Sequence, residues 1–188
     1  QPVDLVRRED GRPDPAVLAE EQVVYRGNGE EPDTLDPHLA VGVPAAHVLR
    51  DLFEGLTTES ATGEIIPGVA LRWNISRDAR SYTFYLRRDL VWSNGDPLTA
   101  EDFLFSLRRA ADPRTAASAA TMLLPIQNAR EVLAGELPVE ELGVELLDEF
   151  TLQIEEADRM AQRLQPACTV SFERAGRICA DDQDLQGS

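Results

Sequence analysis

The sequence contains no lysine and few of the residues that most often carry reaction chemistry. Its 18 basic residues are all arginine, and it has two histidines and two cysteines, Cys168 and Cys179, both near the end of the 188 residues. The 34 acidic residues give a formal net charge of −16, so phosphate backbones would repel the chain and no nucleic-acid partner is expected. A single pair of cysteines indicates neither an oxidising nor a reducing compartment.

Long apolar runs are missing as well. The uncharged stretch at residues 116–129 is too short, and too rich in alanine, threonine, serine and asparagine, to cross about 30 Å of hydrocarbon, so no membrane span is expected. No secretion signal is visible, because arginines and acids at residues 7–10 come before any apolar run. A content of 43% hydrophobic and 28% charged residues is typical of a folded globular chain.

The common catalytic and cofactor-binding motifs are also absent. The sequence has no G-x-S-x-G, H-E-x-x-H, Walker loop or G-x-G-x-x-G. His38 and His47 are the only histidines, and neither has a second histidine or cysteine at a ligand-like spacing, so neither a metal nor a cofactor is expected. Asp36 and His38 flank a proline, which favours a rigid turn over a catalytic pair. An enzyme is therefore the weakest hypothesis.

The first part of the chain predicts an extended arm followed by one strand and one helix. Residues 1–21 alternate charges and prolines, and residues 22–26 form a short β-branched and aromatic run that ends at glycine. Pro44 and Gly55 bracket a predicted helix over 45–54, whose apolar face consists of Val48, Leu49, Leu52 and Phe53.

The next hundred residues predict strands and short helices in alternation. Ser81–Leu86 alternates as a half-buried strand, residues 91–92 are expected to continue the sheet, and Thr99 opens a helix with Phe103, Leu104, Leu107 and Ala111 inside. Helical pieces are expected at 116–124 and 126–134, and a hairpin at 143–147 and 150–154. The aromatics Tyr82, Phe84, Trp92, Phe103 and Phe105 favour a small core, with a wet cleft beside Trp92 as the alternative. The whole predicts an α+β fold with a mostly antiparallel sheet.

Several motifs then occur in a fixed order. They are Thr34-Leu35-Asp36-Pro37-His38, Leu49-Arg50-Asp51-Leu52-Phe53-Glu54-Gly55-Leu56, Tyr82-Thr83-Phe84-Tyr85-Leu86-Arg87, and Trp92-Ser93-Asn94-Gly95-Asp96-Pro97-Leu98-Thr99-Ala100-Glu101-Asp102-Phe103. Together with Ala111-Asp112-Pro113 and Leu142-Gly143-Val144, this series resembles the amino-terminal part of the oligopeptide- and dipeptide-binding proteins of ABC importers, extracytoplasmic solute-binding family 5. The resemblance runs from residue 22 to about 155.

The resemblance implies a periplasmic-binding-protein type II-like fold, of which residues 22–55 would be the first part of a large lobe and 56–155 a small lobe. It implies a periplasmic or extracytoplasmic location, and an oligopeptide held through its main chain and delivered to a membrane permease. Val41, Gly42 and Val43 match the stretch that pairs with the peptide backbone. The alternatives are another solute, namely a dipeptide, nickel complex, haem or sugar, or a regulatory or interaction module, although no basic helix-turn-helix is present.

The sequence also departs from the family. Members are much longer, so the chain is expected to be an amino-terminal fragment that has no measurable peptide affinity by itself. Ala117, Ser118 and Ala119 stand where an aromatic often faces the ligand. Residues 156–188 do not resemble the family's continuation, and both disorder and a shifted reading frame would explain this atypical tail.

Overall fold

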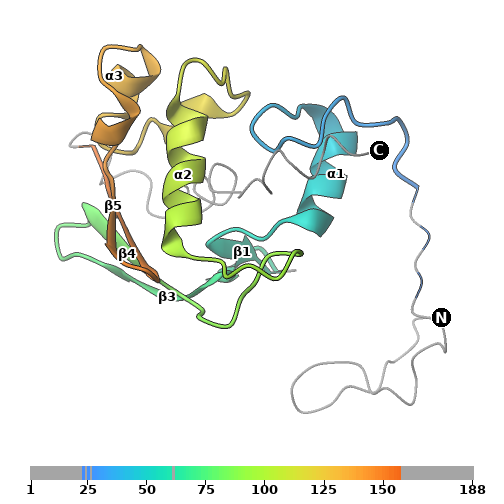
Figure 1. The fold of residues 1–188 in the computed structure, drawn as a ribbon, viewed down its shortest axis with the longest axis horizontal. Coiled ribbons are helices and arrows are strands. Elements are labelled where there is room, and N and C mark those ends of the chain that lie inside the picture. Colours follow the sequence, from blue (N-terminus) through green and yellow to red (C-terminus); the bar gives the residue numbers. More distant parts are fainter. Residues whose placement is uncertain (1–22, 24, 26, 61, 158–188) are drawn as a thin grey trace.

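The computed structural model describes residues 23, 25, 27–60 and 62–157. In chain order they form α1 (Gly42–Leu52), β1 (Thr57–Glu59), β2 (Ile65–Pro67), β3 (Ala70–Ile75), β4 (Ser81–Leu86), α2 (Ala100–Ala111), the 3₁₀ helix η2 (Ala120–Leu123), α3 (Ala129–Leu133), the 3₁₀ helix η3 (Val139–Glu141), β5 (Val144–Asp148) and β6 (Thr151–Glu155) (Figure 1). This arrangement confirms the expected α+β class. The predicted arm at 1–21 and all but two residues of the tail at 156–188 lie outside the described residues.

Two antiparallel sheets are present in the described part of the chain. The larger has the strand order β3-β4-β6-β5, and the smaller is the hairpin β1-β2. The pairing of β4 with β6 sets Tyr82 opposite Ile154 and Phe84 opposite Leu152, so their side chains share one face of the sheet. The predicted strand at Ser81–Leu86 and the predicted hairpin are confirmed. The hairpin β1-β2 was missed, because three-residue strands are too short to show a periodic pattern.

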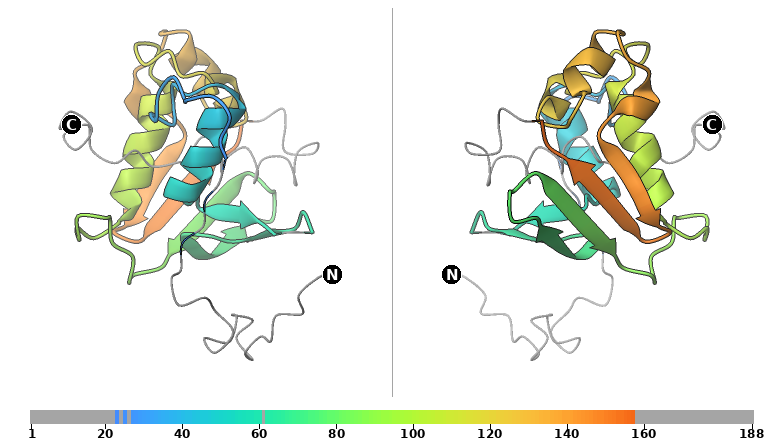
Figure 2. Two further views of the ribbon diagram at one scale, coloured as in Figure 1. Left: turned by 90° about the vertical axis from the view of Figure 1, so that its right-hand side faces the viewer. Right: turned by 90° about the vertical axis from the view of Figure 1, so that its left-hand side faces the viewer.

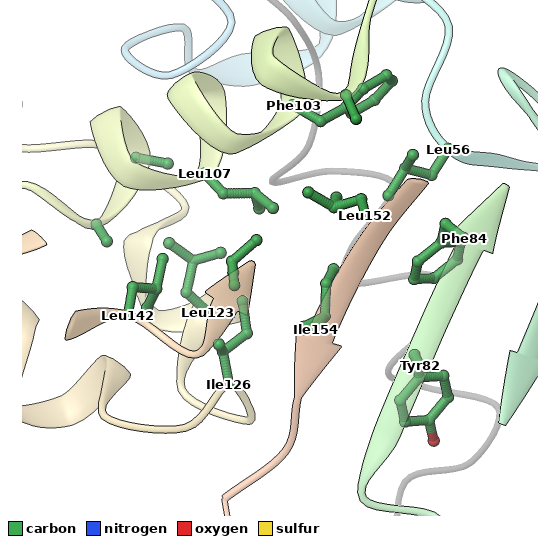
Figure 3. Close-up of a cluster of buried hydrophobic side chains, with 14 of the residues drawn as sticks. Leu56, Tyr82, Phe84, Phe103, Leu107, Leu123, Ile126, Leu142, Leu152 and Ile154 are labelled. Atoms are coloured by element: carbon green, nitrogen blue, oxygen red, sulfur yellow. The ribbon is translucent and has the colours of Figure 1, made fainter. Parts of the chain in front are cut away.

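The core lies between the larger sheet and α2. Phe103 and Leu107 of α2 point toward Leu152 and Ile154 of β6, while Tyr82 and Phe84 extend the same cluster along β4 (Figure 3). Seen from two opposite sides, β5 and β6 lie against α2 (Figure 2). The cluster of buried apolar side chains begins at Leu56 and ends at Ile154. It therefore contains no residue of α1.

The start of α2 agrees with the sequence. Thr99 and Asp102 form a capping box, in which the Asp102 carboxylate accepts the Thr99 amide at 2.7 Å. Phe103 is fully buried as expected, but Phe105 is 59% exposed and does not belong to the core. Two residues turn an α-helix by about 200°, so Phe103 and Phe105 face opposite directions.

Other expectations were wrong in detail. Residues 91–92 do not continue the sheet, because Val91 makes only an isolated bridge to Pro97 within a turn. Of the predicted strand at 22–26, residues 22, 24 and 26 lie outside the described residues, and Val23 and Tyr25 are exposed without regular structure. The helical pieces at 116–134 shrink to η2 and α3.

Helix α1 also differs from the prediction. It begins three residues earlier than expected and ends at Leu52, after which Phe53 is extended. Only Ala45 and Leu49 are buried on it, and Leu52 is exposed rather than packed. Of the predicted apolar face, Leu49 is thus buried, Val48 and Phe53 are partly buried, and Leu52 is exposed.

The opposite environments of Phe103 and Phe105 give a matched test of the core. Replacing Phe103 by alanine should lower the free energy of unfolding by about 3–5 kcal/mol, because it leaves a cavity between α2 and β6. Replacing Phe105 by alanine should change it by no more than about 0.5 kcal/mol. Urea denaturation followed by circular dichroism measures both values, and equal losses for the two variants would contradict this packing.

Candidate functional site

The segment before α1 is a rigid turn centred on Asp36. The Asp36 carboxylate accepts the amide of His38 at 2.9 Å, and the Asp36 carbonyl accepts the amides of Leu39 and Ala40 at 3.1 and 2.8 Å. The hydroxyl of Thr34 accepts the Asp36 amide. This arrangement confirms the turn that was favoured for Asp36 and His38.

Arg109, in the last turn of α2, holds this turn against that helix. Its Nη1 donates to Oδ1 of Asp36 at 2.9 Å and its Nη2 to Oδ2 at 2.5 Å. Nη1 also lies 2.7 Å from Nδ1 of His38. In Figure 1 the segment that precedes α1 (blue) loops toward the upper end of α2. A two-pronged guanidinium–carboxylate contact fixes orientation as well as distance, so the turn has one placement on the helix.

The contact with Arg109 also fixes the tautomer of His38. Arginine can only donate hydrogen bonds, so Nδ1 of His38 is the acceptor and the ring proton is on Nε2. Nε2 then donates to the hydroxyl of Ser106, 3.2 Å away. His38 is 3% exposed and Ser106 is also buried.

A serine, a histidine and an aspartate thus share one hydrogen-bonded group, but it is not a catalytic triad. In a triad the aspartate accepts the Nδ1–H of the histidine, and Nε2 takes a proton from the serine. Here Nδ1 faces Arg109, Nε2 already carries the proton, and the buried serine offers no access for a substrate. The group can hold two parts of the chain together but cannot activate a nucleophile.

Ser118 adds a second attachment from the loop after α2. Its amide donates to the carbonyl of His38 at 2.8 Å, and its hydroxyl lies 3.2 and 3.1 Å from the carbonyl oxygens of His38 and Ala40. The sequence drew attention to Ser118 only as a missing aromatic. Arg109 and Ser106 were missed altogether, since no local pattern marks one arginine among 18.

The three candidate ligand-binding residues come directly after this clamped turn. Val41 is the N-cap of α1 and has an extended backbone (φ −130°, ψ 153°), while Gly42 and Val43 form the first turn of the helix. Gly42 has φ +84°, a conformation that favours glycine. Val41 and Val43 are largely exposed, Val43 to 64%. The amides of Gly42 and Val43 have no acceptor within the helix, and no side chain caps them.

The lowered pKa values belong to aspartates at turns, and neither Asp36 nor His38 is among the groups that lower them. A side-chain hydrogen bond from Arg114, reinforced by the Arg114 amide, lowers the pKa of Asp112. Ser76 and the Arg80 amide lower the pKa of Asp78, and the amide of Phe150 lowers that of Asp148. Among residues 27–60 and 62–157 no group of three or more potential ligands could hold a metal ion, and no helix is long and apolar enough to cross a membrane.

Glu156 is a buried carboxylate at the end of the larger sheet. Its amide donates to the carbonyl of Arg80 at 2.7 Å, and the residue is 3% exposed. Neither carboxylate oxygen has a hydrogen-bond partner among the residues that the structure describes. A buried polar group without such a partner costs free energy.

The family described as bacterial extracellular solute-binding proteins, family 5 Middle, matches residues 64–178. The chain belongs to family 5. The matched range includes part of the segment beyond residue 156, so the family resemblance extends farther along the chain than expected from the motifs. Family 5 consists of solute-binding proteins rather than enzymes, as expected, and its extracellular description agrees with the expected extracytoplasmic location.

Curated relatives and solved structures agree with this assignment. The chain is 45% identical to the periplasmic oligopeptide-binding protein OppA of Escherichia coli over 139 residues, which are 73% of this chain and 25% of OppA. It is 42% identical to the probable deoxycholate-binding periplasmic protein YgiS of Escherichia coli over 139 residues, 73% of this chain and 26% of YgiS. The substrate-binding domain of an oligopeptide ABC transporter from Bacillus anthracis superposes with a TM-score of 0.79 at 35% identity, covering 87% of this chain and 31% of that chain. The chain therefore spans about a quarter of the length of its curated family 5 relatives.

Removing Arg114 tests the electrostatics of the turn after α2. The Arg114→Gln substitution should raise the pKa of Asp112 toward its ordinary value, because it removes the largest cause of the lowered pKa. A lowered folded-state pKa contributes stability above the ordinary pKa of aspartate, and this contribution is lost as the pH falls through the lowered value. The variant should therefore lose less stability on acidification. A carbon-13 NMR titration of the Asp112 carboxyl measures the shift, and an unchanged midpoint would refute the assignment.

Glu156 should be a site where a substitution stabilises the protein. The Glu156→Gln substitution removes a buried charge but keeps the shape, so the free energy of unfolding should rise by about 1 kcal/mol. Glu155→Gln is the matched control, since Glu155 accepts a hydrogen bond from Gln153 at 2.7 Å and should gain nothing. Urea denaturation of both variants measures the difference. A loss of stability in Glu156→Gln would contradict this prediction and would mean that another group stabilises the carboxylate.

Proposed function

We propose that this chain is part of the peptide-binding component of an ABC importer, which holds an oligopeptide mainly through its main chain and delivers it to a membrane permease. The observation that carries the proposal is the 45% identity to an oligopeptide-binding protein over 73% of the chain. The role is binding without bond chemistry. A 42% identity to a probable deoxycholate-binding protein makes a different solute the second candidate.

We propose that the chain contributes to two lobes. Residues 22–55 would be the first part of the large lobe and residues 56–155 the small lobe. In support, the apolar core begins at Leu56 and ends at Ile154, whereas α1 contributes nothing to it. A segment that buries so little of its own surface is typical of one piece of a larger packed body.

The proposed ligand contact is the main chain of Val41, Gly42 and Val43. Val41 has the extended conformation that pairing with a guest backbone requires, and the exposed amides that follow have no acceptor among the described residues. A peptide carbonyl or carboxylate could accept from them. Contacts of this kind do not depend on the side chains of the ligand, as a receptor for varied peptides requires.

The test replaces the corresponding quarter of Escherichia coli OppA with residues 27–157 of this chain and measures binding of tri-alanine and tetra-alanine by calorimetry. Val43→Pro in this chimaera removes one amide proton at a first-turn position where proline fits a helix. We expect it to weaken binding by about two- to tenfold, the usual worth of one hydrogen bond. Val43→Ala keeps the amide and should bind as the unsubstituted chimaera does.

Two controls separate the outcomes. The 188-residue chain by itself should give no binding heat, because most of the wall that would enclose a peptide lies in the other three quarters of the relatives' length. A chimaera that folds but binds neither peptide would refute the peptide proposal, and the same chimaera binding deoxycholate would favour the second candidate. Equal affinities of the Val43→Pro and Val43→Ala chimaeras for the peptides would show that the Val43 amide does not bind the ligand.

A further inference from the structure

Helix α1 has few contacts that fix the position of its first turn. Only two of its 11 residues, Ala45 and Leu49, are buried, and its N-cap side chain makes no hydrogen bond. Among the described residues that precede it, the side-chain amide of Asn28 donates to the carbonyl of Pro44 at 3.2 Å. If Val41–Val43 meet a ligand, something outside α1 must set the direction of their amides.

The turn that precedes them is held much more firmly. Arg109 donates hydrogen bonds to both carboxylate oxygens of Asp36 and to the ring of His38. Ser118 donates hydrogen bonds to the carbonyls of His38 and Ala40. Arg109 and Asp36 are both mostly buried, so solvent screens their ion pair less than it would a surface pair. Together with the hydrogen bond between Ser106 and His38 and that from the Ser118 amide to the His38 carbonyl, at least seven polar contacts therefore act on residues 36–40 from α2 and the loop that follows it.

These contacts end one residue before the candidate stretch. The amides of His38, Leu39 and Ala40 are all donated to Asp36, and the carbonyls of His38 and Ala40 are taken by Ser118. The next amide along the chain is that of Val41, which is given no acceptor by any described residue. The contacts within the turn and from the loop after α2 thus engage three amides and two carbonyls of the turn, and the donors without a described acceptor begin at the next residue.

We infer that Arg109 and Ser118 are positioning residues, which hold the turn at residues 36–40 so that the amides of Val41–Val43 keep the orientation a ligand needs. The ligand part of this inference rests on the proposed function. The ligand would then be an extended backbone that offers hydrogen-bond acceptors. The proposed small lobe, through Arg109 and Ser118, would decide where this ligand lies, although α1 carries the donors.

The first arm of the test needs no ligand. Amide hydrogen exchange is measured by NMR on the full 188-residue chain, for Arg109→Gln and for the matched control Arg108→Gln on the same helix. Arg109→Gln should speed exchange at Leu39, Ala40 and Ser118 by at least about tenfold, while amides that pair β4 with β6 change by less than about twofold. Arg108→Gln, whose side chain contacts the carbonyl of Glu140 instead, should leave the three amides unchanged.

A spectroscopic readout separates positioning from a general loss of stability. The nitrogen-15 signals of the His38 ring should show the Nε2–H tautomer in the unsubstituted chain and in Arg108→Gln, and lose it in Arg109→Gln. If Arg109→Gln does not fold, Ser118→Ala removes only a hydroxyl and should speed exchange at Ala40 by at least about threefold. Unchanged exchange at Leu39 and Ala40, or an equal rise across the sheet, would overturn the inference.

The second arm uses the chimaera with OppA. Arg109→Gln should weaken binding of tri-alanine by at least about tenfold, and Arg108→Gln should not weaken it. Faster exchange with unchanged affinity would overturn the link between the clamp and the ligand. A chimaera without any peptide binding would refute the proposed function, whereas the exchange arm would still decide whether Arg109 holds the turn.

Discussion

The contact of Arg109 with Asp36 and His38 joins two parts of the chain that are more than 70 residues apart. The hydrogen bonds of Ser106 and Ser118 with His38 and Ala40 reinforce this charged contact. A guanidinium group suits this task, since its rigid fork matches a carboxylate and still has donors for the imidazole ring. The position of the exposed first turn of α1 depends on this cluster.

The sheet domain provides the fixed body to which the turn is attached. Its core is a continuous apolar cluster between α2 and strands β4 and β6, so α2 cannot shift without disrupting buried contacts. Arg109 projects from the last turn of that helix, and Ser118 from the loop that follows it. A surface that binds through main-chain hydrogen bonds needs rigid support, because these bonds weaken rapidly when donors and acceptors lose alignment.

Membership of family 5 gives this geometry a context. The chain covers about a quarter of its curated relatives, and its described residues comprise one complete apolar core together with one helix that lacks a core of its own. The polar cluster at Asp36 joins the segment that leads into this helix to α2, which packs on that core.

The sequence by itself determined the strand at Ser81–Leu86, the start of α2 at Thr99, the hairpin at its end and the family, since these follow from periodic patterns, capping residues and motif order. It failed where direction in space matters. Phe105 was placed in the core although its helix turns it outward, and Leu52 was placed on the packed face of α1 although it is exposed. Only the tertiary structure decided which arginine meets Asp36, why the ring of His38 carries its proton on Nε2, and what Ser118 holds. The chain has 18 arginines that are chemically alike, and contacts between residues far apart in the sequence leave no periodic trace in it.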